Sequence, residues 1–452
     1  MIENLKIIFK TSPLKTISLL ILGWIIMIGL NYYLNEHHFF TGTRITFPMS
    51  VVYISEFTIF GFLFAFSFLL LGLYTLKNIE KINTNILLIV SITLIILGNF
   101  SQGSIHQIFL RSFIDTDFQY YHDAIKITNG YNFISTYLEN QDQLTMHAKT
   151  HPPFTVWIHY LFLKLTNHSP LGLALFMSLV GLLPILVFNK ILDIFPNLEK
   201  FNKNILLLIF VLIPAINIYS IVSIDAQFLL YTLLFIYGLL IIDRSEKLNI
   251  KGILITFLGF TLANLISFSG TFLAALAFFY CIYQIIKNKK LYPFLNFSLV
   301  GMLFIFILVI LYFTLNYNHL EAFLQASKSE NPNGFRGFDQ PLVYIFTRLE
   351  NISEILLFLS FGFFAYLFKP KVFNFNKTQI QFTLPIIAFS TLMLMFITGA
   401  YGTGETARAC LYIYPFFLLL LINIKNSQIL INIAYIALVQ TFFMQLVGDY
   451  FW

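Results

Sequence analysis

Residues 294–316 read FLNFSLVGMLFIFILVILYFTLN and contain no charged side chain. Because a helix that crosses the bilayer core needs about 20 apolar residues, this run predicts a membrane-spanning helix. Similar runs recur on either side of it, between residues 17 and 447. The sequence therefore predicts an all-α, polytopic membrane protein with about 13 transmembrane helices. The expected spans are 17–33, 57–76, 85–100, 171–192, 205–222, 227–242, 252–268, 271–286, 294–316, 350–368, 380–398, 409–424 and 428–447.

The composition excludes an ordinary soluble domain. Of the 452 residues, 58% are hydrophobic and 11% are charged, against roughly 25% charged in soluble proteins. A sequence pI of about 9.0 would suggest nucleic-acid binding in a soluble protein. Here the basic residues lie in short loops between apolar runs, so we expect membrane lipids, and no nucleic acid, among the partners.

The positions of the basic residues predict the orientation of the chain. With the N-terminus in the cytoplasm, 18 of the 27 lysine and arginine residues fall in the inner segments. The other 9 lie in the longer outer segments, at Arg44, Arg111, Lys126, Lys149, Lys164, Lys328, Arg336, Arg348 and Arg408. Cytoplasmic loops of membrane proteins are enriched in such residues. We therefore expect a multi-pass protein of the plasma (inner) membrane, within the cell envelope.

Two outer segments, 101–170 and 318–349, are too long to be simple connectors. We divide the chain into an N-terminal transmembrane hairpin (1–84) and a transmembrane module (85–452) that contains both segments. The first segment includes an apolar stretch, 154–165, which is too short to span a bilayer. Its apolar residues share one helical face that Thr155, His159 and Lys164 interrupt, which favours a helix lying in the membrane interface.

The densest polar cluster of the first outer segment runs from Asp115 to Asp123 and reads DTDFQYYHD. A carboxylate here can act as a general base, or Asp115 and Asp117 can bind a divalent cation, Mg or Mn. The alternative is a solvated, helix-capping acidic loop. If the segment is helical, Asp117 and Tyr121 share a face, with Tyr120 and Asp123 close to it.

Two further motifs carry basic residues at the outer side. His151 precedes Pro152 and Pro153 at the start of the expected interfacial helix, where a cap or a solvent contact is the alternative to a ligand contact. Glu405 and Arg408 follow Gly402 and Gly404 and can form an ion pair on one helix face. Alternatively, Arg408 can bind the phosphate of an anionic lipid headgroup.

Ion-coupled transport is the main rival to enzymatic chemistry, because carriers place ionisable residues at mid-membrane. The interiors of the expected spans are nearly free of them, and Glu350 and Glu354 lie near the start of the tenth span. The acidic residues thus gather at the outer face, which favours interfacial chemistry.

The order Asp117-x-x-x-Tyr121-x-Asp123-Ala followed by His151-Pro-Pro-Phe resembles the GT-C superfamily of polytopic glycosyltransferases. In that superfamily, an Asp of the large first outer loop precedes a tyrosine-bearing helix. A basic residue and a proline then introduce an interfacial helix. The chain is similar to the transferase that adds aminoarabinose to lipid A and to mannosyltransferases that use polyprenyl-phosphate mannose. Two departures are the extra spans 17–33 and 57–76, and His151 where the lipid A enzyme has a lysine.

The resemblance implies transfer of a hexose or pentose from a polyprenyl-phosphate donor to a lipid, glycan or protein acceptor at the outer face. It implies Asp117 as the catalytic carboxylate, with Asp115 as the second candidate. From the positions of the residues themselves, we expect substrate binding by Tyr120, Tyr121, Asp123, His151, Arg336, Glu405 and Arg408. The alternatives are a transporter or flippase of lipid-linked sugars, and a polymerase or ligase of surface polysaccharide.

Overall fold

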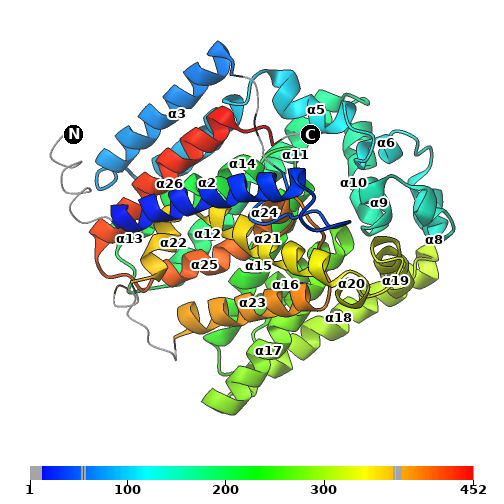
Figure 1. Cartoon of the computed structure of the whole chain (residues 1–452). Helices are drawn as coiled ribbons and strands as arrows, with labels where there is room; N and C mark the ends of the chain where they lie inside the picture. Colours follow the sequence, from blue (N-terminus) through cyan, green and yellow to red (C-terminus); the bar gives the residue numbers. More distant parts are fainter. Residues whose placement is uncertain (1–12, 52–53, 55–56, 370–371, 373–378, 451–452) are drawn as a thin grey trace. The chain divides into compact units, whose positions relative to one another are not determined.

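The computed structural model describes the chain except residues 1–12, 52–53, 55–56, 370–371, 373–378 and 451–452. Throughout the described residues the secondary structure is helical, with no strand (Figure 1). The predicted all-α fold is thereby confirmed. Lys6, Lys10, Lys371 and Lys377, which the charge pattern assigns to the inner side, lie outside the described residues.

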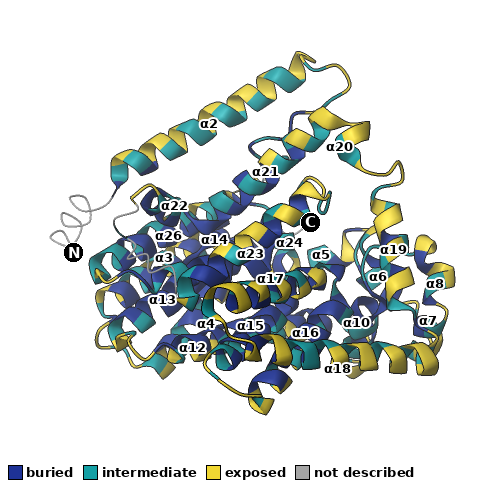
Figure 2. Ribbon diagram, turned by 90° about the horizontal axis from the view of Figure 1, so that it is seen from below, coloured by how far each residue is buried: buried dark blue, intermediate teal, exposed yellow. Residues whose placement is uncertain are grey.

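Eight helices are long and apolar enough to cross a membrane, by length and composition. They are α2 (Leu14–Glu36), α3 (Ile59–Lys77), α11 with α12 (Pro170–Leu182 and Pro184–Asp193), α15 (Ile224–Asp243), η3 with α17 (Phe268–Gly270 and Thr271–Asn288), α18 (Tyr292–Leu315), α23 (Ile380–Ile397) and α26 (Ser427–Val447). These helices identify a multi-pass membrane protein. The eight helices differ in exposure. In the most apolar 18-residue stretch, 6% of the residues of α2 are buried, whereas 72% of those of α15 are buried (Figure 2).

The count of about 13 spans is not confirmed, and the remaining expected spans are short or interrupted. Shorter apolar helices occupy three of them: α4 (Thr84–Phe100), α16 (Ile250–Ile266) and η5 with α25 (Leu411–Ile413 and Tyr414–Leu421). A 17-residue helix rises only about 25 Å, less than the roughly 30 Å of a bilayer core. The other two are broken, at Pro214 between α13 (Lys200–Leu212) and α14 (Pro214–Tyr219), and at Ser360 between α21 (Pro341–Leu359) and α22 (Phe361–Leu367).

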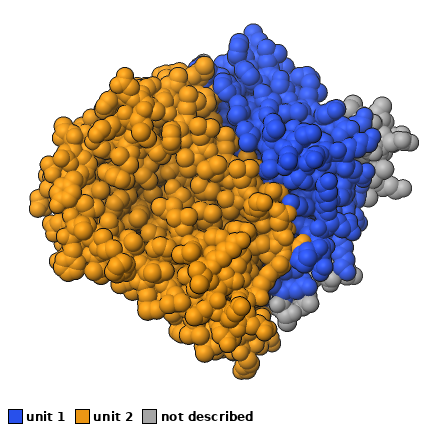
Figure 3. All heavy atoms as spheres, turned by 180° about the vertical axis from the view of Figure 1, so that it is seen from behind, with its two compact units in different colours: residues 1–104, 196–219, 335–450 blue, residues 105–195, 220–334, 451–452 orange. Residues whose placement is uncertain are grey.

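The chain divides into two compact units, which Figure 3 distinguishes by colour. Unit 1 comprises residues 1–104, 196–219 and 335–450, and unit 2 comprises residues 105–195, 220–334 and 451–452. Both units are assembled from separate stretches of the chain. The predicted boundary after residue 84 therefore stays a prediction.

Unit 1 contains a chain of buried amide side chains that joins α4, α14 and α26. Gln102 Nε2 donates to Gln445 Oε1 (2.6 Å), and Gln445 Nε2 donates to Asn217 Oδ1 (2.9 Å). Asn99 Nδ2 completes the series by donating to the Asn217 carbonyl (2.7 Å). Buried polar groups persist where they are hydrogen-bonded, so these contacts fix three helices at one end.

Unit 2 is centred on the close pair α15 and α16. A Cβ on Gly259 would lie 2.5 Å from the Phe235 amide nitrogen and from the Tyr231 carbonyl oxygen. Only glycine permits this approach of the two backbones, as small residues do at helix interfaces in membranes. The pair provides the rigid wall against which α10 and α11 pack.

The first outer segment of unit 2 folds into short helices. They are η1 (His106–Leu110), α5 (Arg111–Ile114), α6 (Tyr121–Ala124), α7 (Gly130–Ser135), α8 (Tyr137–Asn140), η2 (Gln141–Gln143), α9 (Met146–Lys149) and α10 (Pro153–Leu165). In the second outer segment, α19 (His319–Glu330) belongs to unit 2 and α20 (Arg336–Asp339) to unit 1. Helix α19 reaches back to the first segment, because the Ala322 carbonyl accepts a hydrogen bond from Gln141 Nε2 (3.0 Å).

Helix α10 matches the predicted helix over 154–165, and two of its three polar residues, Thr155 and His159, are buried whereas Lys164 is exposed. Thr155 Oγ1 donates to the Ile266 carbonyl at the end of α16 (2.6 Å), and His159 is buried beside it. Leu165, on the predicted apolar face, is 72% exposed. Thr155 and His159 thus face the interior of unit 2, and the position of α10 at the membrane interface stays a prediction.

Candidate functional site

The three aspartates of the 115–123 segment have different surroundings. Asp123 is buried, and its Oδ2 accepts hydrogen bonds from the Thr145 amide (2.9 Å) and hydroxyl (2.7 Å). Asp115 Oδ2 lies 2.9 Å from His106 Nε2, and both side chains are about half exposed. Asp117 is exposed, and its carboxylate has no hydrogen bond or ion pair with another described side chain. Of the three, Asp117 is therefore the one whose carboxylate is exposed and makes no such contact.

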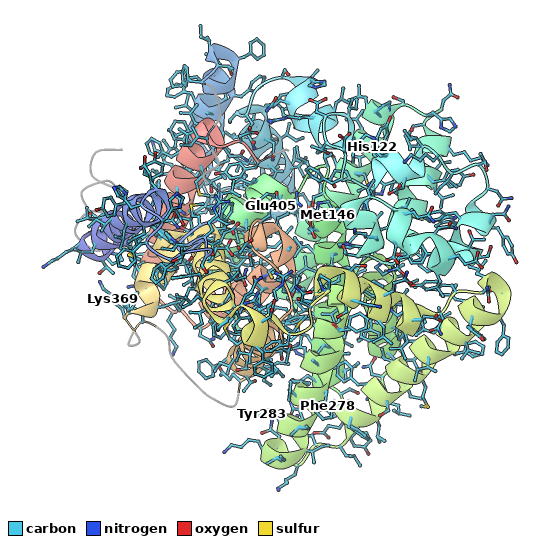
Figure 4. The ribbon with its side chains drawn as sticks, turned by 45° about the vertical axis from the view of Figure 1, so that its right-hand side comes forward. His122, Met146, Phe278, Tyr283, Lys369 and Glu405 are labelled. Atoms are coloured by element: carbon cyan, nitrogen blue, oxygen red, sulfur yellow. The ribbon has the colours of Figure 1, made fainter. Side chains whose placement is uncertain are left out.

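The backbone around Asp117 consists of turns, so the conditional expectation of a helix there is wrong. Helix α5 ends at Ile114 and α6 begins at Tyr121, so Asp117 and Tyr121 do not share a helix face. The turn is fastened instead by His122 Nε2, which lies 2.5 Å from the Thr116 carbonyl oxygen. Figure 4 labels His122 on α6.

The structure brings Tyr120 and His151 together, although 30 intervening residues separate them in sequence. The ring of the buried Tyr120 lies 5.4 Å from the rings of both His151 and His159, between centroids. His151 is oriented by its Nδ1, 2.9 Å from the His147 carbonyl oxygen. Burial lowers the pKa of His159 to about 4, so this ring is neutral at physiological pH. Tyr121 packs separately against Phe113.

The residues predicted as metal ligands do not form a closed cage. Among the described residues there is no group of three or more His, Cys, Asp or Glu side chains that could hold a metal ion. Asp115 is already engaged by His106. The divalent cation stays a prediction, and no step below depends on it.

In unit 1, Glu405 and Arg408 form the ion pair that the sequence offered as the alternative to phosphate binding. Arg408 Nη2 lies 2.5 Å from Glu405 Oε2, and the two side chains remain 20% and 12% exposed. Glu405, which Figure 4 labels, precedes α24 (Thr406–Ala409) with a φ of 50°. The pair orients the guanidinium and leaves part of it accessible.

Arg336 and Arg348 lie near the segment that leads to Arg408. A Cβ on Gly402 would lie 3.8 Å from Arg336 Nη1. Arg348 donates to the carbonyl oxygens of Phe396 (2.8 Å), Ala400 (2.5 Å) and Tyr401. Arg348 is thus committed to the backbone, while Arg336 stands beside the glycines.

Sequence reasoning gave no role to Glu350, Asn351 and Glu354 of α21, which are all buried in unit 1. Glu350 Oε1 accepts from Ser50 Oγ and from the Gly404 amide, both at 3.2 Å. Asn351 Nδ2 donates to Glu350 Oε2 (3.0 Å), to the Gly402 carbonyl (2.9 Å) and to Thr406 Oγ1 (2.7 Å). Their spacing of one, three and four residues on one helix face was the available signal.

Burial raises the pKa of both carboxyl groups on α21, which is not one of the eight candidate spans. The pKa of Glu354 is raised further by the negative charge of Glu350. Two buried carboxyls in contact disfavour the state in which both are charged, and this adds to the effect of burial on the pair.

The predicted site residues divide between the units, with Asp115, Asp117, Tyr120, Tyr121, Asp123 and His151 in unit 2 and Arg336, Glu405 and Arg408 in unit 1. Tyr120 and His151 are together in the first group, and Glu405 and Arg408 in the second. Comparison with protein-family models, with curated proteins and with solved structures finds no match to this chain.

Proposed function

We propose that the chain is a GT-C-type glycosyltransferase that moves a hexose or pentose from a polyprenyl-phosphate donor to a lipid, glycan or protein acceptor at the outer face of the plasma membrane. The observation that carries this proposal is the contrast among the three aspartates. His106 engages Asp115 and Thr145 engages Asp123, whereas the Asp117 carboxylate is exposed on a turn held by neighbouring residues. An accessible carboxylate on a fixed backbone is what a general base requires.

The chemistry needs one displacement at the anomeric carbon. The acceptor oxygen bonds to that carbon while Asp117 takes the hydroxyl proton. The bond from the carbon to the phosphate oxygen breaks, and the electron pair leaves with the polyprenyl phosphate. This single displacement inverts the anomeric carbon.

The other predicted residues assist in binding. Tyr120 and Tyr121 offer aromatic faces and hydroxyls to the sugar, and His151 contributes a ring beside Tyr120. Asp123 positions Thr145 by accepting hydrogen bonds from its amide and its hydroxyl, and Thr145 in turn contacts the substrate. Arg408, oriented by Glu405 and accompanied by Arg336, supplies positive charge for the donor phosphate.

A transporter of lipid-linked sugars is the second candidate, and the buried pair Glu350 and Glu354 favours it. Ionisable groups buried in a membrane protein commonly serve ion or proton coupling. A transporter needs no base at residue 117, so the two functions separate on that substitution.

The deciding experiment is transfer by the purified protein. A panel of polyprenyl-phosphate hexoses and pentoses is incubated with the protein and with candidate acceptors, and release of polyprenyl phosphate is measured. We expect release with at least one donor, and its loss in Asp117→Asn. Movement of intact donor between the leaflets of a vesicle, unchanged by Asp117→Asn and without any release, would instead establish transport.

A further inference from the structure

Helix α21 presents a row of polar side chains to the segment 400–406 of unit 1. Asn351 Nδ2 donates hydrogen bonds to the Gly402 carbonyl and the Thr406 hydroxyl. Glu350 accepts from the Gly404 amide, and Glu354 Oε2 accepts from the Thr406 amide (3.3 Å). These contacts surround Gly404 and Glu405 and end two residues before Arg408. The segment is thus fastened to α21 through side chains, with both carboxyls receiving its backbone amides.

The backbone of this segment needs such fastening. Tyr401 and Glu405 have φ angles of 64° and 50°, in the left-handed region that side chains other than glycine rarely adopt. Residues in this region persist where surrounding contacts hold them. The position of Glu405, and with it the ion pair to Arg408, therefore depends on the contacts from α21.

The two carboxyls are not equivalent. Glu350 receives hydrogen bonds from three donors, namely Ser50 Oγ, the Gly404 amide and Asn351 Nδ2. A carboxylate can accept all of them, whereas a neutral carboxyl offers fewer acceptor sites. A hydrogen bond joins Glu350 and Glu354 directly. This pattern indicates that Glu350 carries the negative charge and Glu354 carries the proton. The protonated Glu354 donates the hydrogen bond between the two carboxyls, and Glu350 accepts it.

We infer that Glu350 and Glu354 hold one proton between them and, through it, position the loop that carries Glu405 and Arg408. They are positioning residues for the phosphate-binding arginine, an inference that rests on the proposed function. When the proton is lost, two carboxylates share one buried site. Their repulsion then loosens the loop and reduces the affinity for the donor.

Charged and titratable groups surround the pair. Those near α21 from its own and neighbouring elements include Arg44, Arg336, Arg348, Asp339, Tyr344, Tyr401, Glu405, Arg408, Cys410, Tyr412, Tyr414, Tyr450 and Tyr219. Arg348 lowers the pKa of Glu350, and Glu405 raises that of Glu354. Both effects favour the distribution in which Glu354 carries the proton.

The direction of the pH effect follows from the raised pKa of the pair. When the loop is held against α21, the glutamate pair binds the proton more tightly than when the loop is loose. In the loose state each glutamate has its ordinary pKa of about 4.3. The fastened state is therefore most stable at low pH, and it loses stability as the pH rises toward the raised pKa of the folded protein.

The test uses the full-length protein and farnesyl-phosphate mannose, a phosphodiester whose single charge does not titrate between pH 6 and 9. Its binding is measured across this range for the wild type, Glu354→Gln, Glu350→Gln and the exposed control Glu80→Gln. The amide introduced by Glu354→Gln reproduces the protonated carboxyl, so we expect wild-type affinity at pH 6 and no decline at higher pH. The wild type and the control should lose at least about tenfold in affinity.

Loop motion is measured separately through the labelling rate of a cysteine at the exposed Thr403, after subtracting the reaction of the native protein. We expect labelling to accelerate with pH in the wild-type background and to become independent of pH with Glu354→Gln. Glu350→Gln should label rapidly at all pH values, because an amide cannot satisfy three donors.

The outcomes separate this inference from the proposed function. Donor binding with the same pH profile in Glu354→Gln as in the wild type would overturn the inference and leave the function intact. Absence of donor binding, together with pH-dependent labelling that Glu354→Gln abolishes, would support the proton-held loop and contradict the proposed function. Labelling that does not change with pH in the wild type would overturn the inference directly.

Discussion

Gln440 in α26 accepts a 2.7 Å hydrogen bond from the Phe361 amide at the break between α21 and α22. On the other side of the break, Gln440 Nε2 donates to the Leu357 carbonyl, also at 2.7 Å. One side chain thus satisfies the Phe361 amide, which the interruption at Ser360 leaves without a helical partner. It also gives a second donor to the Leu357 carbonyl, which accepts from the Ser360 amide as well (3.3 Å). Both contacts are part-buried, and a buried backbone group that loses its hydrogen-bond partner is costly.

Replacing Gln440 with methionine, which has a similar size and no amide, should destabilise unit 1. We expect a loss of roughly 1–3 kcal/mol, chiefly because the Phe361 amide is left without a partner. The measurement is the thermal unfolding temperature in detergent. Val439→Met, at the neighbouring exposed position, should have little effect. Equal stability of the two variants would show that water or lipid replaces the glutamine.

Asp117→Asn should lower the transfer rate of the folded protein by about 100-fold or more, the range for a positioned acid or base. Donor affinity should change little. Asp115→Asn should have a smaller effect, because the Asp115 carboxylate is already engaged by His106. Glu139→Gln, an exposed acidic residue of the same outer segment, serves as the control. If Asp117→Asn has only a mild effect and Asp115→Asn is inactive, Asp115 is the general base and Asp117 is not.

Arg408→Ala should weaken binding of farnesyl-phosphate mannose by about 2 kcal/mol, or roughly 30-fold, as expected for loss of a charge-assisted hydrogen bond. Arg408→Lys should weaken it less, because the charge remains and the planar fork is lost. If the ion pair with Glu405 has only a structural role, Glu405→Gln and Arg408→Ala should lower stability equally. Donor affinity of the surviving folded protein would then be unchanged.

Acid should destabilise unit 2 through His159. Burial lowers the pKa of His159 to about 4, so the folded state favours the neutral ring. The stabilisation is complete above the unfolded pKa of about 6.5 and declines as the pH falls from there toward 4. The unfolding temperature of His159→Gln should therefore fall less between pH 7 and pH 5 than that of the wild type. His168→Asn, at an exposed position, should behave like the wild type.

The orientation can be tested with single cysteines and a membrane-impermeant thiol reagent. Cysteines at Thr128 and Asn333 should react from outside the cell, and one at Lys290 should not. Thr128 is preferable to Gly130, where a Cβ would lie 2.7 Å from Trp157 Nε1. The native Cys281 and Cys410 are buried, which keeps the background low. Labelling of all three from the same side would show that α18 does not cross the membrane, because α18 is the only expected span between Lys290 and Asn333.

Much of the fold was predictable because apolar runs in a membrane protein determine helices directly. The limits of α15, α18 and α26 lie close to the predicted spans. The breaks were less accessible. Pro214 was visible in the sequence as a residue without an amide donor, whereas the break at Ser360 depends on Gln440, 80 positions further along the chain.

The candidate site was predictable by residue type but not by environment. The cluster from Asp115 to Asp123 was visible as a dense polar run. Which aspartate remains accessible depends on His106 and Thr145, whose positions arise only when the short helices pack. Likewise, Glu350 and Glu354 were visible four residues apart, but their burial follows from the loop that covers them.

The hydrogen bond between Thr155 and Ile266 also constrains the order of events during synthesis. The two residues are 111 positions apart, so at roughly 5–20 residues per second the ribosome needs about 6–22 s to deliver the acceptor after the donor. Throughout that interval α10 exists without α16, and the Thr155 hydroxyl takes another partner, such as water or a carbonyl of its own helix. The first outer segment can therefore reach its final packing only after more than half of the chain has been made.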